Sequence, residues 1–156
     1  MDIYLLRHAE AEEQRPGGSD AERELTERGH AQAQRAAQWL VAQGVQVGAI
    51  LSSPLIRAVQ TAQPVAEALG MAIVTDPRLA GMRLTAGAVR DMAREYEVGE
   101  SVLLVGHEPD MSDLLRELTR GQVEVKKAAL VLVSCARPSP GGGTLRWLVP
   151  SKLQGD

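Results

Sequence analysis

Short apolar runs of strand-like composition alternate along this chain with longer segments of helical period, and this alternation limits the possible folds more than any other feature. Strands that alternate with helices are typical of a layered α/β fold with a largely parallel sheet. We expect the first and fourth runs to be the most buried. The six runs predicted to be strands are 2–6, 48–52, 71–75, 101–105, 128–134 and 144–149.

The segments between these runs carry helix signals. Thr26 and Ser53 are candidate N-caps of the first two helices, and Pro54 is expected at the first position of the second. A glycine follows each of these two helices, as is common at helix ends. The four helices are predicted between Thr26 and Gly44, between Ser53 and Gly70, over 85–97 and over 109–119.

The composition argues against several classes of protein. Lys plus Arg is 17 against 20 Asp plus Glu, the net charge is -3, and aromatic residues make up only 3%. A nucleic-acid surface needs clustered positive charge and stacking rings, so we expect no nucleic-acid partner. No apolar run approaches the roughly 20 residues of a membrane span, the N-terminus lacks the features of a signal peptide, and Cys135 is the only cysteine. We therefore expect one cytoplasmic domain over residues 1–156, with no membrane partner.

Charged or chargeable side chains follow three of the predicted strands. Arg7 and His8 come directly after the first strand, Arg57 lies near the start of the helix after the second, and His107 follows the fourth. In open α/β sheets, ligands bind outside the carboxyl ends of the strands, so these four side chains should meet in one crevice. Forked guanidinium donors and helix N-termini suit a phosphoryl group.

His8 could act as a nucleophile in such a crevice. The neighbouring positive charges of Arg7 and Arg57 disfavour a protonated ring, so they should lower the pKa of His8 and keep it neutral. Attack of the neutral ring on phosphorus would give a phosphohistidine intermediate, which water then hydrolyses.

Four motifs in this chain, "LLRHAEAE", "LTERG", "LSSPLIRAVQTA" and "LLVGHEPDMSDLL", resemble those of the histidine phosphatase superfamily, in the same order and spacing. Within it, the chain is similar to the short phosphohistidine phosphatases of the SixA type. The resemblance implies a phosphoglycerate-mutase-like fold of three layers, with a mostly parallel central sheet and helices on both faces. It also implies a cofactor-free site in which His8 is the nucleophile and Arg7, Arg57 and His107 bind the phosphoryl group.

The general acid of related mutases and acid phosphatases has no convincing counterpart here; Glu10 and Glu108 are the candidates for a proton donor. An alcohol leaving group needs such an acid, because without one it leaves as an alkoxide. An alkoxide is about as poor a leaving group as hydroxide, whose conjugate acid, water, has a pKa of about 15.7. An imidazole, with a pKa of about 6.5, leaves far more readily. The missing acid therefore favours phosphohistidine on a signalling or phosphotransfer protein as the substrate. With no large insertions in the chain, we also expect a shallow mouth that admits a protein side chain.

Three alternatives stay open. Two histidines and nearby acids could hold a hydrolytic zinc ion, although no H-x-x-x-H or Cys/His cluster is present. The same fold could instead serve a broad small-molecule phosphomonoesterase or mutase. A catalytically inactive module that binds phosphorylated proteins is the third. The sequence defines neither the oligomeric state nor the roles of Thr26, Arg78, Arg83, Lys126 and Lys127.

Overall fold

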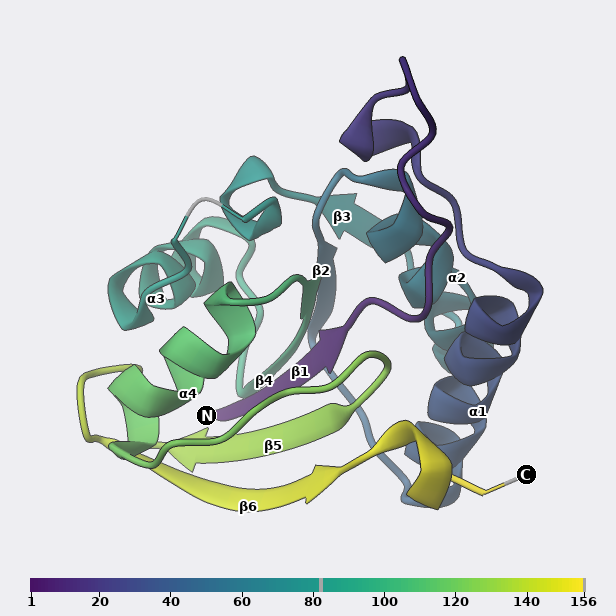
Figure 1. Ribbon diagram of the computed structural model, residues 1–156. Helices are drawn as coiled ribbons and strands as arrows, with labels where there is room; N and C mark the ends of the chain where they lie inside the picture. The colour runs from purple at the N-terminus through teal and green to yellow at the C-terminus, as the bar shows by residue number, and fades with distance from the viewer. Residues whose placement is uncertain (82, 156) are drawn as a thin grey trace.

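The computed structural model describes residues 1–81 and 83–155, and its centre is a single six-stranded sheet (Figure 1). All six predicted strands are present, within two residues of the expected bounds. The strands are β1 (Asp2–Arg7), β2 (Ala49–Ser52), β3 (Ile73–Thr75), β4 (Ser101–Gly106), β5 (Leu130–Cys135) and β6 (Gly143–Val149).

The sheet is mostly parallel, as predicted. Its order is β3-β2-β4-β1-β5-β6, with β3, β2, β4 and β1 parallel and β5 antiparallel to both β1 and β6. In the register of the two central strands, Arg7 lies opposite Gly106. His8 and His107 therefore leave neighbouring strands at the same level of the same sheet edge.

Helices cover both faces of the sheet, which confirms the three-layer architecture. The helices α1 and α2 pack on one face and α3 and α4 on the other (Figure 1). None of the helices among the described residues is both long and apolar enough to cross a bilayer. The helices are α1 (Glu27–Ala42), α2 (Ile56–Leu69), α3 (Ala86–Glu95) and α4 (Asp110–Thr119), with short 3-10 turns η1 (Asp20–Glu22), η2 (Pro77–Leu79) and η3 (Ser151–Leu153).

The central strands are buried on both faces, because successive side chains of a strand point to opposite sides. In β1, Ile3 and Leu5 join the core beneath α3 and α4, whereas Tyr4 and Leu6 join the core beneath α1 and α2. The strand β4 is buried in the same way from Val102 to Gly106. The prediction that these two strands are the most buried is only partly correct, because β5 is as buried as β4 and more so than β1.

The helix starts were only partly predicted. Thr26 does cap α1, since its Oγ1 accepts a hydrogen bond from the N–H of Gly29 at 3.0 Å. The prediction that Ser53 caps the second helix, with Pro54 at its first position, is wrong. The helix α2 begins at Ile56 and Leu55 is its N-cap residue. Ser53 is instead fully buried, with its hydroxyl turned toward His107.

Candidate active site

His8 lies immediately beyond the end of β1 and is fixed by two hydrogen bonds to backbone carbonyls. Its backbone N–H donates to the carbonyl of Gly106 at 3.0 Å, and its ring Nδ1 lies 2.8 Å from the carbonyl oxygen of Ala9. A carbonyl oxygen only accepts hydrogen bonds, so Nδ1 carries the ring proton. The lone pair of the neutral ring is therefore on Nε2, which is the nucleophilic form.

His107 lies beside it, beyond the end of β4. The ring centroids of His8 and His107 are 5.1 Å apart, with the ring planes at 51°. The Nε2 of His107 is 2.8 Å from Ser53 Oγ, while its buried Nδ1 has no hydrogen-bond partner. Each histidine is only 6% exposed, so the structure brings the two predicted imidazoles together in a nearly closed space.

The two predicted arginines differ in how they are held. Arg7, the last residue of β1, donates from Nη1 to the carbonyl of Val125 at 2.9 Å. Arg57, the second residue of α2, is 5% exposed and contacts Asp20 through both terminal nitrogens. Its Nη1 donates to the Asp20 carbonyl at 2.8 Å, and its Nη2 lies 3.0 Å from the Asp20 carboxylate. The buried Nε of each arginine has no partner, so donor capacity remains at this site.

Burial and positive charge keep both histidines neutral. Burial, followed by the charges of His107, Arg57 and Arg7, lowers the pKa of His8 to about 3, although the hydrogen bond to Ala9 opposes the shift. Burial and the charge of Arg57 likewise lower the pKa of His107 to about 4. At neutral pH the site therefore holds two uncharged imidazoles among guanidinium groups, an arrangement suited to an anion and a nucleophile.

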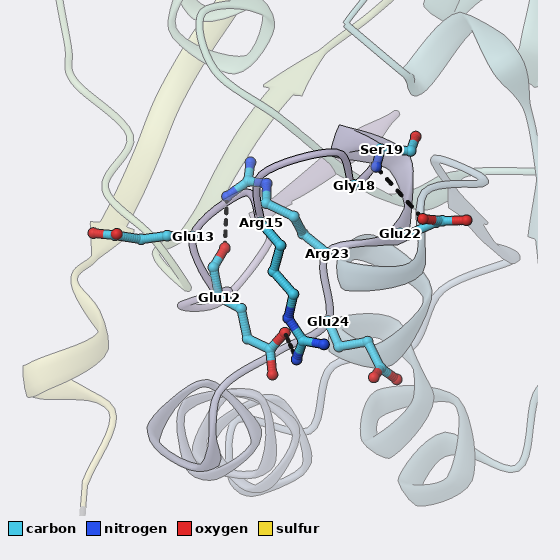
Figure 2. A pocket seen from close by; sticks show the side chains of 8 residues that line it. All are labelled: Glu12, Glu13, Arg15, Gly18, Ser19, Glu22, Arg23 and Glu24. Carbon is cyan, nitrogen blue, oxygen red and sulfur yellow. Dashed lines mark hydrogen bonds and ion pairs between the residues drawn. The ribbon is translucent and has the colours of Figure 1, made fainter.

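Residues 11–25, which we name the cover segment, lie over Arg57 and form the loop drawn in purple at the top of Figure 1. A bridge between Ala11 and Leu25 closes the base of this segment, and the turn η1 within it carries Asp20. The segment forms by itself a hollow of about 120 Å³, and Figure 2 shows the side chains that line it. The hollow is lined by Glu12, Glu13, Arg15, Gly18, Ser19, Glu22, Arg23 and Glu24.

The sequence predicts a shallow mouth, whereas the side chains of the site are largely covered in this structure. His8, His107 and Arg57 are each at most 6% exposed, and the Asp20 carboxylate occupies Nη2 of Arg57. A phosphoryl group that binds this nitrogen has to displace the Asp20 carboxylate.

Sequence reasoning missed two residues of this site, Ser53 and Asp20. Ser53 was read as a helix cap, because a serine before a proline and an apolar helix has that pattern. Asp20 lies in a loop with no apolar period. One signal for it does exist, since Ser19 and Glu22 form the S-x-x-E pattern of a capping box, and both of its hydrogen bonds are present.

The two candidate proton donors are engaged at helix starts. The carboxylate of Glu10 accepts a hydrogen bond from Thr26 Oγ1 at 2.9 Å and lies 3.3 Å from Arg28. The carboxylate of Glu108 accepts from the N–H and hydroxyl of Ser112 at 3.1 and 2.5 Å. A proton-donor role for either stays a prediction.

Arg78, whose role the sequence left undefined, forms ion pairs within the fold. Its guanidinium lies 2.5 Å from Asp76 and 2.7 Å from Glu95, and Asp76 also accepts a hydrogen bond from the Tyr96 hydroxyl at 2.9 Å. These bonds join η2 to α3. In residues 1–81 and 83–155, no three His, Cys, Asp or Glu side chains are grouped to hold a metal ion.

The fold defines a class, the α/β proteins of phosphoglycerate-mutase-like fold, and the two histidines and two arginines gather at one edge of its sheet. Residues 3–86 match the model of the histidine phosphatase superfamily (branch 1). The chain belongs to this superfamily, as the motifs indicated.

Known relatives refine this assignment. The chain is 28% identical to the phosphohistidine phosphatase SixA of Escherichia coli (strain K12), over 94% of this chain and 92% of that protein. A structure of the protein histidine phosphatase SixA complexed with tungstate superposes with a TM-score of 0.82, at 27% identity, covering 97% of this chain and 98% of that one. A probable phosphoglycerate mutase, GpmB of Yersinia pestis (strain Pestoides F), is 43% identical over 51% of this chain and 37% of that protein. These similarities support a phosphatase. The relatives are named after two activities, phosphohistidine phosphatase and phosphoglycerate mutase.

Proposed function

We propose that this chain is a phosphohistidine phosphatase that works through a covalent phospho-His8 intermediate. One observation carries the proposal. The hydrogen bond from His8 Nδ1 to the Ala9 carbonyl leaves the lone pair of a neutral ring on Nε2, beside two guanidinium groups. A nucleophile that is uncharged at neutral pH, next to donors for phosphoryl oxygens, is what transfer of a phosphoryl group to a side chain requires.

The proposed reaction has two displacements at phosphorus. The Nε2 lone pair of His8 forms a bond to phosphorus while the P–N bond of the substrate breaks, and the electron pair leaves with the substrate's imidazole. Water then attacks the phosphorus of phospho-His8 and releases inorganic phosphate. Overall, one proton of the water ends on the substrate's imidazole and its hydroxyl ends on the phosphate.

The other predicted residues bind the transferred group in this scheme. Arg7 and Arg57 neutralise its oxygens, and His107 adds a further donor. For Arg57 this binding is an exchange, since a phosphoryl oxygen replaces the Asp20 carboxylate at Nη2. No step needs a metal ion or an organic cofactor.

The proposed substrate is a phosphohistidine on a protein domain of signalling or phosphotransfer. In the described residues, neither Glu10 nor Glu108 has a hydrogen bond or ion pair with His8; their carboxylates are engaged by Thr26 and Ser112 instead of being held beside the nucleophile as an acid. A substrate whose leaving group is imidazole has less need of one. The similarity to proteins named SixA supports the same substrate class. The expected cytoplasmic location stays a prediction.

A second candidate function is a broad small-molecule phosphomonoesterase. The 43% identity to a probable phosphoglycerate mutase, over half of this chain, favours this alternative. It would share the nucleophile and the phosphoryl-binding residues, and would differ in the leaving group.

The test is phosphate release from a histidine-phosphorylated phosphotransfer domain, compared with a panel of alkyl, aryl and sugar phosphates, with and without a chelator. We expect the phosphohistidine to be preferred, chelator to have no effect, and His8→Ala to lose at least about 10³-fold in turnover. His30→Ala, which removes an exposed histidine of α1, is the matched control and should retain activity. Preference for small esters would support the second candidate, and binding without turnover would support an inactive module.

A further inference from the structure

Ser53 contacts His107, and the proposed mechanism gives Ser53 no role. It follows β2, is fully buried, and its backbone N–H is bonded to the carbonyl of Val105 at 2.9 Å. Its hydroxyl oxygen lies 2.8 Å from Nε2 of His107 and accepts a hydrogen bond from the N–H of Leu55 at 3.2 Å. Ser53, predicted from the sequence as a helix cap, thus connects the backbone of Leu55 to the ring of His107.

The hydrogen bonds of Ser53 decide the tautomer of His107. Either Nε2–H donates to Oγ, or the Ser53 hydroxyl donates to the Nε2 lone pair. In the first case the hydroxyl proton has no acceptor, since Oγ has no other acceptor within hydrogen-bond distance in the described part of the chain. An unpaired buried hydroxyl is costly. In the second case Oγ accepts from Leu55 and donates to His107, and the proton without a partner in the free protein is the one on Nδ1, where a bound phosphoryl oxygen can accept it.

We infer that Ser53 is a positioning residue: it donates to Nε2 of His107 and so fixes the tautomer in which Nδ1 carries the proton. The inference rests on the proposed function only in taking the phosphoryl group to bind here. Nδ1 is the remaining polar atom of the ring, and it is buried without a partner. As an N–H it is a donor to an anionic oxygen, whereas as a lone pair it would repel that oxygen.

The direct test is the tautomer itself, read from the ¹⁵N chemical shifts of the histidine rings in the free protein at neutral pH. The signals of His107 are those missing from the spectrum of His107→Ala. We expect Nδ1 protonated and Nε2 unprotonated in the wild type, and loss of this single tautomer in Ser53→Ala. A proton on Nε2 in the wild type would overturn the inference.

The functional test is binding of inorganic phosphate, measured by titration calorimetry. We expect Ser53→Ala to weaken binding about ten-fold, the loss of one hydrogen bond to a charged group. Ser52→Ala is the matched control, because Ser52 is equally buried but its hydroxyl donates to the Ser53 carbonyl at 2.9 Å. It should bind phosphate within about two-fold of the wild type, since it removes no donor from the site.

A double-mutant cycle separates positioning from a general loss of structure. If Ser53 acts through His107, Ser53→Ala should have little further effect on phosphate binding in a His107→Ala background. An equal loss in both backgrounds, or an equal loss in Ser52→Ala, would contradict the inference. Neither the spectra nor phosphate binding involves turnover, so both results stand apart from whether phosphohistidine is the substrate.

Discussion

The two histidines at the ends of β1 and β4 and the cover segment over Arg57 are held in different ways. His8 and His107 follow the two central strands, are 6% exposed, and are fixed by Ala9, Gly106 and Ser53 at 2.8 to 3.0 Å. Asp20 lies on a three-residue turn of exposed residues, with its side chain 53% exposed.

In the proposed mechanism, this difference separates a fixed nucleophile, His8, from an exchangeable anion, the Asp20 carboxylate. The histidines are neutral and set in place before any ligand arrives, which reduces the cost of ordering them on binding. The Asp20 carboxylate offers Arg57 the type of oxygen that a phosphoryl group offers, on a part of the chain that few buried contacts hold. In this scheme the neutral histidines are held at the sheet edge, and the carboxylate that a phosphoryl group displaces lies on the adjacent cover segment.

Removal of Arg57 should have the largest effect on this arrangement. Arg57→Ala removes the donors that both the cover segment and the phosphoryl group use, so we expect kcat/KM for phosphohistidine to fall by about 10²- to 10³-fold. Arg90→Ala is the control, since Arg90 also donates to a backbone carbonyl, that of Pro138 at 2.9 Å, but lies on α3. A fall below ten-fold for Arg57→Ala would contradict its role in binding the transferred group.

The buried histidines should make stability depend on pH. Their pKa values in the folded state, about 3 for His8 and about 4 for His107, lie below the ordinary 6.5. Between pH 6.5 and 4 the unfolded chain binds protons that the folded chain does not, so the free energy of unfolding falls as pH falls. The expected slope is about 1.4 kcal/mol per pH unit for each histidine.

Urea unfolding at several pH values measures this slope. Between pH 6.5 and 5 the buried Asp76 contributes little, because Arg78 lowers its pKa from an ordinary 3.8 and it stays ionised in both states. His8→Gln should reduce the slope by the share of one histidine. An unchanged slope would show that His8 is not buried as a neutral ring.

Substitution of Asp20 should have the smallest effect, and it should strengthen the binding of phosphate instead of weakening it. Asp20→Asn keeps the backbone carbonyl on Arg57 but removes the competing charge, so we expect inorganic phosphate to bind a few-fold more tightly. Glu13→Gln removes one charge from the same exposed segment, and no contact joins Glu13 to Arg57 in the described residues. Unchanged or weaker phosphate binding in Asp20→Asn, measured beside this control, would mean that Asp20 does not compete with phosphate.

The strands and the sheet edge that carries the site could be predicted from local patterns. Apolar runs located β1 and β4, and the rule for the carboxyl ends of parallel strands placed His8 beside His107. Ser53 could not be predicted, because its partner is distant in the sequence and its local pattern also fits a helix cap. The glycine of "LTERG" is a similar case: a Cβ on Gly29 would lie 1.9 Å from the carbonyl oxygen of Glu10, a contact that only the folded chain reveals.

The most direct test of the covalent mechanism is to trap the intermediate. The wild-type protein would be mixed with a histidine-phosphorylated domain that carries a labelled phosphoryl group, quenched in base, digested and examined by mass spectrometry. We predict label on Nε2 of His8, stable in base and labile in acid, with none in His8→Ala. Turnover by the wild type with no label on His8 at any early time would contradict the account.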